Sequence, residues 1–400
     1  MALTNLTTAR GEALTGIPWQ AYPRPQLKRD SYVNLNGTWE LTADGYHGPV
    51  LVPFCPESAL SGVGRHFPDG STLTYRRSFT LPDGFNRGRV LLHFGAVDQI
   101  AEVYVNQKKV GSHSGGYESF CFDITDALDG ENHLEVRVID DLRHHILPYG
   151  KQVLNRGGMW YTPVSGIWQT VWLESVPKDY VNSIDIQVTL ESAAITVTPA
   201  LSGVVTLEGR DYPLENGIAI VRPEIPHLWT PEDPYLYRFT LTAGDDRIES
   251  YFALRTLKAK TVSGIPRLCL NGKPYFFHGL LDQGYWPDGL FTPAAPECYT
   301  DDILAAKALG FNMLRKHIKV EPEQFYYDCD RLGMVVFQDM VNNGDYRFLR
   351  DTAVPSLFGQ KRNDTRYHPD SAARKAFLDA MEATVRQLKN HPCICYWTIF

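Results

Sequence analysis

The sequence predicts a multidomain β plus α/β fold, in which two β-sandwiches precede a parallel α/β unit. Three observations predict it. Short runs of alternating apolar and polar residues, separated by turn residues, fill the chain up to Leu257. A proline-rich segment at 225–237 interrupts these runs, and strand and helix patterns alternate from Asn271 onward. A chain of 400 residues is long enough for two or three domains of this kind.

The first sandwich is predicted for residues 1–178. Turn residues such as Pro82-Asp83-Gly84 separate its apolar runs, which favours hairpins and Greek-key connections over helices. The predicted strands are 73–81, 90–94, 101–105, 134–138 and 168–173.

A second β module is predicted for residues 179–258, with the size of an immunoglobulin-like sandwich. Its predicted strands are 184–190, 195–198, 204–207, 236–242 and 251–254. The segment 225–237 contains three prolines. Because proline cannot donate to a hydrogen-bonded ladder, this segment is expected to be a rigid connection between two strands.

Residues 259–400 are predicted to form the α/β unit. Its strands are expected at 275–281, 311–315, 334–338 and 393–400, and its helices at 300–310, 322–332 and 371–388. Thr300 is expected to cap the first helix. The alternation requires parallel strands with right-handed crossovers. The unit has roughly half of the ~250 residues that a (β/α)8 or TIM barrel needs, so it corresponds to the first half of such a barrel.

Composition and charge exclude several classes of partner. The formal net charge is −7 and the chain has no long run of like charges, which argues against nucleic acid and suits a neutral ligand such as a sugar. The N-terminus lacks the pattern of a signal peptide and no stretch of 18 apolar residues occurs, so we expect a cytoplasmic protein without a membrane partner. A homo-oligomer is compatible with these features. The seven scattered cysteines indicate reduced thiols.

Candidate site residues follow from the ends of the predicted parallel strands, where barrels carry their chemistry. Arg315 is the first candidate, because it ends a strand whose other residues suit a core. The alternative is a structural ion pair of Arg315 with Asp282 or Asp339. The candidates are Asp282, Gln283, Tyr285, Trp286, Asn312, Arg315, His317, Asp339 and Trp397. The pair His144-His145 is expected in a loop, and Cys393 and Cys395 are expected from alternation in a buried strand.

Known catalytic motifs and family resemblances narrow the function. The patterns G-x-x-x-x-G-K-[ST], H-E-x-x-H and G-x-S-x-G are absent, which argues against an NTPase, a metalloprotease and a serine hydrolase of those types. Several segments resemble glycoside hydrolase family 2, the β-galactosidase and β-glucuronidase family. Four of them, at 23–26, 35–39, 75–79 and 165–168, resemble its jelly-roll sugar-binding domain, and 225–237 resembles the signature of its second domain. Lys389-Asn390-His391-Pro392 and the following strand with Trp397 resemble its fourth barrel strand.

This resemblance implies a retaining β-glycosidase with one Glu as acid/base and a second as nucleophile. In the family, Asn-Glu follows the fourth strand at once, so both carboxylates are expected after Phe400 and the chain is expected to be part of a longer protein. Glu297, Glu321 and Glu323 precede or enter helices and are not convincing substitutes. The competing interpretation is a non-catalytic carbohydrate-binding fragment.

The resemblance also assigns roles to individual residues. It places Arg315 where an arginine holds the nucleophile, within an Asn-x-x-Arg pattern that begins at Asn312, and His317 comes one residue earlier than the common spacing. Gln283 stands in the place of a substrate-binding His. Asp339 stands where many β-galactosidases have a metal-binding Glu, so a carboxylate there could take Mg²⁺ or bind a sugar hydroxyl; no resident cofactor is otherwise implied. Four aromatic residues are candidates for stacking on the sugar, namely Tyr285, Trp286, Trp397 and Trp160.

Overall fold

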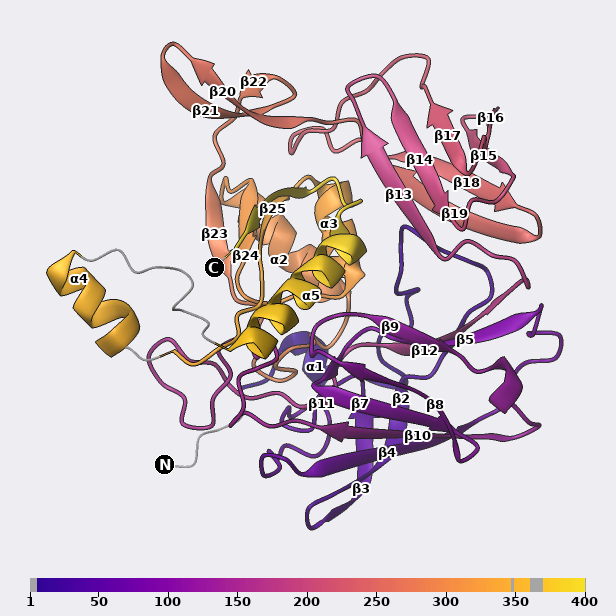
Figure 1. The fold of residues 1–400 in the computed structure, drawn as a ribbon, viewed down its shortest axis with the longest axis vertical. Helices are drawn as coiled ribbons and strands as arrows, with labels where there is room; N and C mark the ends of the chain where they lie inside the picture. The colour runs from indigo at the N-terminus through magenta and orange to yellow at the C-terminus, as the bar shows by residue number, and fades with distance from the viewer. Residues whose placement is uncertain (1–5, 347–348, 360–369, 400) are drawn as a thin grey trace.

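The computed structural model describes residues 6–346, 349–359 and 370–399. Figure 1 shows a large β domain at the bottom, a smaller β domain at the upper right and an α/β unit between them and to the left. The described part of the chain has no helix that is both long and apolar enough to cross a membrane.

The first domain is a sandwich of two antiparallel sheets over one hydrophobic core. A four-stranded sheet has the order β1-β12-β5-β9, and a six-stranded sheet has the order β3-β2-β4-β10-β7-β8. Alternating burial along strands such as β2 shows why the sequence pattern predicted them. Two short helices, α1 (Ala9–Glu12) and η1 (Thr125–Ala127), accompany the strands. The strands are β1 (Val33–Asn34), β2 (Gly37–Ala43), β3 (Tyr46–Val52), β4 (Thr72–Phe79), β5 (Arg89–Phe94), β6 (Val97–Asp98), β7 (Ile100–Val105), β8 (Lys108–Ser114), β9 (Phe120–Asp123), β10 (Asn132–Ile139), β11 (Gly166–Ile167) and β12 (Val171–Val176).

The second domain also pairs two antiparallel sheets, ordered β13-β14-β17 and β16-β15-β18-β19. Its strands are β13 (Ser183–Val188), β14 (Ala193–Thr198), β15 (Val204–Leu207), β16 (Arg210–Pro213), β17 (Ile218–Val221), β18 (Tyr237–Ala243) and β19 (Asp246–Phe252). The proline-rich segment connects β17 to β18 without a strand of its own, as predicted. A small separate sheet of β20 (Leu257–Val262), β21 (Ile265–Leu270) and β22 (Lys273–Pro274) follows, which the sequence pattern did not predict.

The α/β unit is a parallel sheet in the order β23-β24-β25-β26. Its strands are β23 (Gly279–Asp282), β24 (Met313–Lys316), β25 (Val335–Asp339) and β26 (Ile394–Thr398). Its helices are α2 (Glu297–Ala308), α3 (Glu323–Leu332), α4 (Val354–Phe358), which a π-helical turn at Leu349–Ala353 precedes, and α5 (Ser371–Leu388). Gly333 ends α3 in the left-handed conformation, and the Asp370 side chain caps α5.

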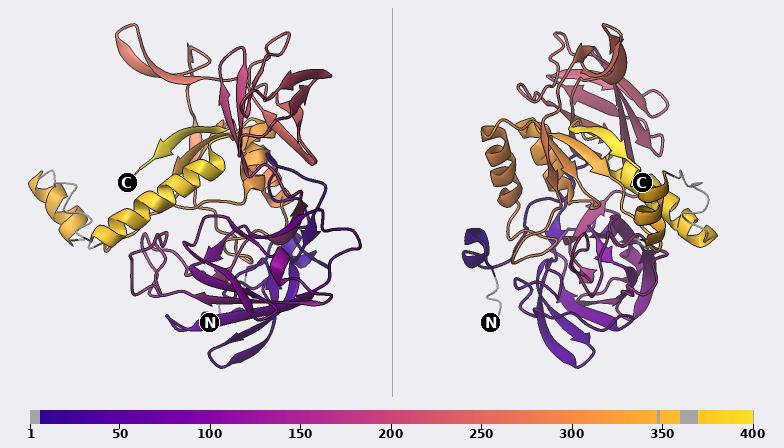
Figure 2. Two further views of the ribbon diagram at one scale, coloured as in Figure 1. Left: turned by 45° about the vertical axis from the view of Figure 1, so that its right-hand side comes forward. Right: turned by 90° about the vertical axis from the view of Figure 1, so that its left-hand side faces the viewer.

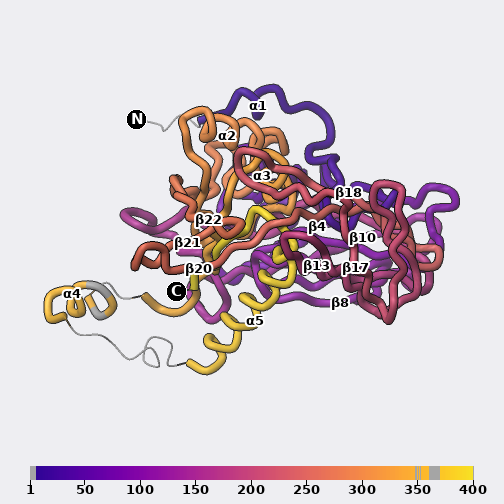
Figure 3. The backbone as a smooth tube through the Cα atoms, turned by 90° about the horizontal axis from the view of Figure 1, so that it is seen from above, coloured from indigo at the N-terminus to yellow at the C-terminus, as the bar shows by residue number. Residues whose placement is uncertain are grey.

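Two details of the α/β unit correct the sequence predictions. The helix α2 begins at Glu297, one turn before the predicted cap Thr300, because Pro296 starts the helix without a side-chain cap. The segment between β25 and α5 contains α4, which was not predicted. Figures 2 and 3 show α4 lying apart from the rest of the molecule.

Polar contacts dock the α/β unit on the second sandwich. Asn390 bonds the backbone of β13, donating to Ile184 O at 2.7 Å and accepting from Ile186 N at 3.0 Å. His391 contacts the carboxylate of Asp330 in α3 at 2.7 Å, and both side chains are fully buried. The Asn-His-Pro turn that precedes β26 therefore serves as a docking point between the α/β unit and the second sandwich.

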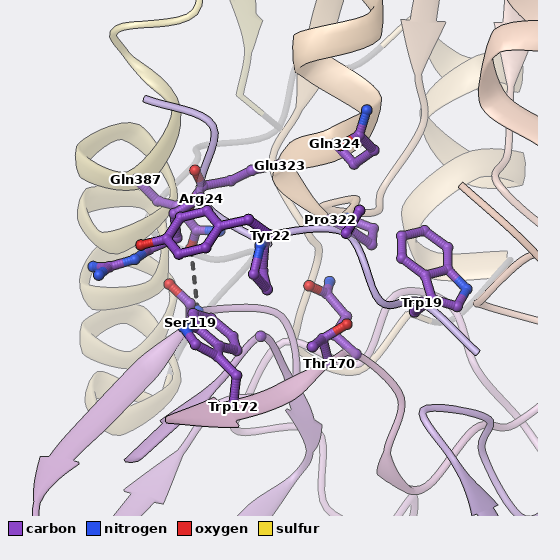
Figure 4. Close-up of a pocket in the computed structure, with 14 residues that line it drawn as sticks. Trp19, Tyr22, Arg24, Ser119, Thr170, Trp172, Pro322, Glu323, Gln324 and Gln387 are labelled. Atoms are coloured by element: carbon purple, nitrogen blue, oxygen red, sulfur yellow. Dashed lines mark hydrogen bonds between the residues drawn. The ribbon is translucent and has the colours of Figure 1, made fainter. Parts of the chain in front are cut away.

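A narrow cavity lies where the first sandwich meets α3 and α5 (Figure 4). Trp172 and Tyr22 line it, and the Ser119 amide donates to Gln387 Oε1 at 3.1 Å across it. Burial raises the pKa of the neighbouring Glu323 carboxyl to about 6. We interpret this cavity as a packing feature of the domain interface.

Candidate active site

Successive side chains along each strand of the parallel sheet point to opposite faces. This alternation determines which of the predicted site residues share a face. Arg315 stands in register with Leu281 on one side and Phe337 on the other. Phe337 in turn pairs with Tyr396, and their rings lie 5.3 Å apart. Asp339 follows two residues after Phe337 and therefore returns to the same face. This face, defined by Arg315, Phe337 and Asp339, is called the Arg315 face below.

Asp339 is the centre of a compact polar cluster on the Arg315 face, at the carboxyl end of β25. Arg315 Nε lies 2.9 Å from Asp339 Oδ1 and 3.1 Å from Oδ2, and His317 Nδ1 lies 2.6 Å from Oδ2. The Asp339 side chain is fully buried, whereas Arg315 keeps 39% of its side chain exposed. Burial alone would raise the pKa of Asp339, but hydrogen bonds from His317, Arg315 and Thr398 outweigh it and lower that pKa.

The geometry around Asp339 confirms one of the sequence alternatives, an ion pair between Arg315 and Asp339. The same geometry leaves the terminal nitrogens of Arg315 available to bind another group. Only Nε of the guanidinium bonds Asp339, and within the described residues its two terminal nitrogens make no hydrogen bond. A guanidinium presents its donors in a rigid plane, so these nitrogens are able to bind a further oxygen acceptor beside Asp339.

His317 links this cluster to the first sandwich. Its Nδ1 faces Asp339, and Lys151 Nζ lies 3.2 Å from its other ring nitrogen, Nε2. A lysine ammonium only donates, so Nε2 accepts from Lys151, and the N–H at Nδ1 donates a hydrogen bond to Asp339 Oδ2. Burial is the main cause that lowers the pKa of Lys151; Arg315 lowers it further, and Asp339 opposes both. A residue of the sandwich is thus part of the polar cluster at the strand ends.

The loop between β10 and β11 carries Lys151 to the cluster. Tyr149 N donates to Asn342 O at 3.0 Å, just beyond β25. Tyr161, farther along the same loop, lies edge-on to the His317 ring at 6.4 Å and 5.3 Å from the Tyr285 ring. Sequence reasoning missed Lys151 and Tyr161. The available signal was a connection between two predicted strands far longer than a hairpin needs, a type of loop that often carries function.

Two predicted residues lie away from the Arg315 face. Asp282 pairs in register with Lys316 on the opposite face, and its Oδ2 accepts from Lys316 Nζ at 2.6 Å. Asn312 precedes β24 and lies at the other end of the sheet, where it bonds the backbone of Phe276 and His278. The prediction that these two side chains line the same site as Arg315 is therefore wrong, because it ignored strand alternation and strand direction.

Asp282 belongs to a buried ion network behind the sheet. Lys316 also donates to Glu321 Oε1 at 2.9 Å, and Lys319 Nζ lies 3.0 Å from the same oxygen. Burial lowers the pKa of Lys319 to about 8, although Glu321 partly offsets it. The Tyr299 hydroxyl of α2 donates to Glu321 Oε2 at 2.7 Å. This network fixes the residues that follow β24, including the stretch that carries His317.

The predicted aromatic platform is divided between two environments. Trp397 pairs with Gln338, whose side chain bonds Tyr326 of α3, so Trp397 faces the helices and packs on the core. Trp286 packs edge-on to Tyr299 of α2 at 6.0 Å. Both tryptophans therefore pack on neighbouring side chains while remaining partly exposed, and a sugar contact by either stays a prediction.

The remaining predicted contacts stay near the loop of the first sandwich. Tyr285 donates to Thr162 O at 3.0 Å and packs on Tyr161. Trp160 packs edge-on to Tyr346 at 5.7 Å. Gln283 is exposed and makes no hydrogen bond within the described chain. A sugar contact by these side chains remains a prediction.

The residues around Asp339 do not resemble a metal site. Within the described ranges, no three His, Cys, Asp or Glu side chains converge in a way that could hold a metal ion. Asp339 engages both oxygens with Arg315 and His317. An oxygen site for Mg²⁺ needs several such ligands, and the structure gives Asp339 cationic and donor neighbours instead. The cavity of Figure 4 shares no lining residue with this cluster.

Comparison with known protein families identifies the chain. Residues 67–147 match the family model of the glycosyl hydrolase 2 galactose-binding domain-like domain, and residues 265–400 match that of the glycosyl hydrolases family 2 TIM barrel domain. The chain belongs to glycoside hydrolase family 2. In family 2 terms, the Arg315 face is part of the TIM barrel domain and Lys151 lies just after the region matched to the galactose-binding-like domain.

Similar family 2 proteins are longer than this chain. A β-galactosidase of Thermoanaerobacter pseudethanolicus is 24% identical over 355 residues, covering 81% of this chain and 44% of that protein. A β-glucuronidase of Bacteroides fragilis is 24% identical over 361 residues, covering 82% of this chain and 49% of that protein. The chain therefore spans less than half the length of these two curated relatives.

Solved structures of family 2 enzymes share the fold. A β-glucuronidase from Ruminococcus gnavus in complex with D-glucuronic acid superposes with a TM-score of 0.74 at 19% identity, covering 95% of this chain and 68% of that chain. A β-galacturonidase from Eisenbergiella tayi bound to galacturonate gives a TM-score of 0.69 at 21% identity, covering 95% and 67%.

Proposed function

We propose that this chain supplies the substrate-binding half of the active site of a retaining β-glycosidase. The substrates we propose are β-galactosides or β-glucuronides, the classes named in the related enzymes. The observation that carries the proposal is the cluster of Arg315, Asp339 and His317 at the carboxyl ends of the strands, the edge where barrel enzymes carry their chemistry. The terminal nitrogens of Arg315 are suited to hold a catalytic carboxylate in place.

The proposed mechanism uses two carboxylates about 5–5.5 Å apart. A protonated Glu donates its proton to the oxygen of the leaving group, while the second Glu attacks the anomeric carbon and forms a glycosyl-enzyme. The first Glu then removes a proton from water, which attacks the same carbon and releases the sugar with its original configuration. Arg315 holds the nucleophile, and Asp339 fixes the orientation of Arg315.

We place both carboxylates in a longer protein that contains this chain, referred to below as the complete protein. The resemblance to family 2 implies that the acid/base is the second residue of an Asn-Glu pair directly after Phe400. The direction of β26 agrees with this proposal, because the strand runs toward the edge where Asp339 and Thr398 lie. Leu281 and Tyr396 remain 55% and 50% exposed. Further barrel strands in the complete protein would bury such apolar side chains.

The finer division of the chain is part of the proposal. We assign residues 1–178 to a jelly-roll sugar-binding domain, 179–258 to an immunoglobulin-like sandwich and 259–400 to the N-terminal half of a (β/α)8 barrel. The two-sheet arrangement of the second domain supports the immunoglobulin-like assignment.

A second candidate function is a carbohydrate-binding fragment without catalysis. One observation favours it: within the described residues, no Glu lies on the Arg315 face. Glu321 is buried in the ion network behind the sheet, and Glu323 lies at the interface with the first sandwich.

A hydrolysis screen of the complete protein decides between these functions. We expect turnover of at least one of 4-nitrophenyl β-galactoside and 4-nitrophenyl β-glucuronide, and none of the matching α-glycosides. Sugar binding without turnover of either β-glycoside would favour the binding function.

A further inference from the structure

The long loop of the first sandwich is fixed at its base before it reaches the strand ends. Gln152 is fully buried, and its Nε2 donates to Asp98 Oδ2 at 2.9 Å and to the Tyr117 hydroxyl at 3.1 Å. Its Oε1 accepts from Val164 N on the returning arm of the loop. Such a buried, satisfied amide holds both arms of the loop in one arrangement.

The backbone next to Gln152 is closely packed and leaves no room for a side chain on Gly150. A Cβ on Gly150 would lie 2.2 Å from the Tyr117 hydroxyl oxygen and 3.3 Å from Ile318 O, so the glycine backbone touches the stretch next to His317. Gly150 has φ of +61° and Lys151 has φ of +59°. A lysine rarely adopts this left-handed conformation, and here the loop holds it there, which directs the side chain toward His317.

The ammonium of Lys151 has N–H groups that no described residue accepts. His317 Nε2 takes one of its three N–H groups at 3.2 Å, and no other described residue accepts from Nζ. Lys151 is only half-buried, and the exposed side of Arg315 lies beside the same cluster. A charged donor with open N–H groups, held by a rigid loop next to the proposed catalytic face, is suited to hydrogen-bond an oxygen of the substrate.

We propose that Lys151 is a substrate-binding residue, contributed by the first sandwich to the site of the α/β unit, which donates a hydrogen bond to an oxygen substituent of the sugar ring. This inference rests on the proposed function and extends it, because it makes the sandwich domain a part of the glycone pocket. His317 orients Lys151 by accepting from it, and Asp339 orients His317 in turn.

The variant K151M in the complete protein tests the proposal, because methionine keeps the length of the side chain and removes the donors. The matched control is K108M, which changes an exposed lysine of β8 in the same sandwich. We expect kcat/KM on the better of the two 4-nitrophenyl β-glycosides to fall on the order of 10- to 100-fold in K151M and to stay unchanged in K108M.

Substrates that each lack one oxygen substituent of the sugar ring distinguish a hydrogen bond from Lys151 to the sugar from a purely structural effect of Lys151. Each monodeoxy analogue of the 4-nitrophenyl glycoside, and the analogue without the 6-substituent oxygen, is assayed with both the unchanged protein and K151M. The proposal predicts that one analogue shows no further loss in K151M, because its missing oxygen is the partner of Lys151. An equal loss on every analogue would mean that Lys151 acts only through His317, and an unchanged kcat/KM would also overturn the proposal.

Binding of free galactose and glucuronic acid, measured by calorimetry, keeps this inference separate from the proposed function. Weaker binding by K151M than by K108M would support the role of Lys151 even if the unchanged protein hydrolyses nothing. Equal binding by the two variants would overturn it.

Discussion

At the scale of single residues, Asp339 is the point on which the candidate site depends. It is a fully buried carboxylate whose charge Arg315 balances and which Arg315 and His317 both orient by hydrogen bonds, and neither partner is adjacent to it in sequence. Removing a partner from a buried charge costs more than the bond itself contributes, because the remaining charge stays desolvated. The cluster is therefore expected to be rigid, and its members to be intolerant of substitution.

Arg315→Lys should lower kcat of the complete protein far more than it lowers stability. Lysine keeps the charge, but a point charge cannot bond Asp339 through one nitrogen and a second carboxylate through two others. We expect kcat to fall on the order of 100-fold or more, while the midpoint of urea unfolding moves little. Arg76→Lys is the matched control, since Arg76 pairs with Glu135 on the open surface of the first sandwich. A lysine variant with normal kcat would show that Arg315 only supports the fold.

Asp98 is expected to make the stability of the first sandwich depend on pH. Burial raises its pKa to about 7, although the hydrogen bond from Gln152 opposes this. The folded state therefore keeps a proton that the unfolded chain loses near its ordinary pKa of about 4. This proton contributes its full stabilisation of the folded state below pH 4. The contribution is lost as the pH rises through 7, and the free energy of unfolding falls by about 1.4 kcal/mol for each pH unit between the two pKa values.

Asp98→Asn replaces the carboxyl with an amide that does not titrate, so the pH dependence due to Asp98 disappears. Urea unfolding at pH 4, 6 and 8 should show the variant gaining stability relative to the unchanged protein as the pH rises. Asp126→Asn, at an exposed position in η1, serves as the control and should show no such trend. A constant difference between Asp98→Asn and the unchanged protein across this range would contradict the assignment.

Sequence reasoning placed Arg315 and Asp339 correctly near the carboxyl ends of their strands, because both strands have a clear apolar pattern. That either residue binds substrate stays a prediction. Sequence reasoning was wrong at Asp282, since one step along a strand turns a side chain to the other face, and no local pattern fixes that step. It missed Lys151 because the contact with His317 joins two domains. Such a contact depends on how the domains dock, which the local sequence does not encode.

At the scale of elements, β12 carries a buried charge network at the interface between the two sandwiches. Glu174 on this strand is fully buried, and Arg24, Arg29 and His93 surround its carboxylate. Burial would raise the pKa of Glu174, but these neighbours outweigh it and lower that pKa well below its ordinary value. Arg29 also binds Asp246 of β19 at 2.8 Å, so the network joins the first sandwich to the second.

Glu174→Gln should destabilise the protein by about 3–5 kcal/mol, because it leaves the buried Arg29 and the partly buried Arg24 without their shared carboxylate. Glu224→Gln is the control. Its partner Arg210 is exposed, and such surface pairs contribute about 0–1 kcal/mol. Chemical unfolding of the two variants measures the difference. Equal unfolding midpoints would mean that the network adds nothing to the docking of the sandwiches.

At the scale of the whole molecule, the order of two β domains and an α/β unit follows from the sequence because its periodicities are long and regular. The exceptions have local causes. The sheet of β20, β21 and β22 is too small and exposed to show a clear apolar alternation. The helix α2 starts without a side-chain cap, so the most obvious capping residue gave the wrong boundary.

The chain of residues 1–400 alone should not hydrolyse aryl β-glycosides. It offers Arg315, Asp339 and Lys151 to a substrate, but the proposed retaining mechanism also needs two carboxylates on the Arg315 face. The purified polypeptide is assayed beside a mock preparation at high protein concentration. Turnover clearly above the mock preparation would mean that a residue within this chain acts as the acid/base, and the proposed position after β26 would be wrong.

The stereochemistry of the complete reaction tests the central claim most directly. In ¹H NMR of the complete protein acting on its best 4-nitrophenyl β-glycoside, the first sugar to appear should be the β anomer, with the α anomer growing only by mutarotation. Initial release of the α anomer, or no release of sugar from either the β-galactoside or the β-glucuronide, would contradict a retaining β-glycosidase site built on Arg315 and Asp339.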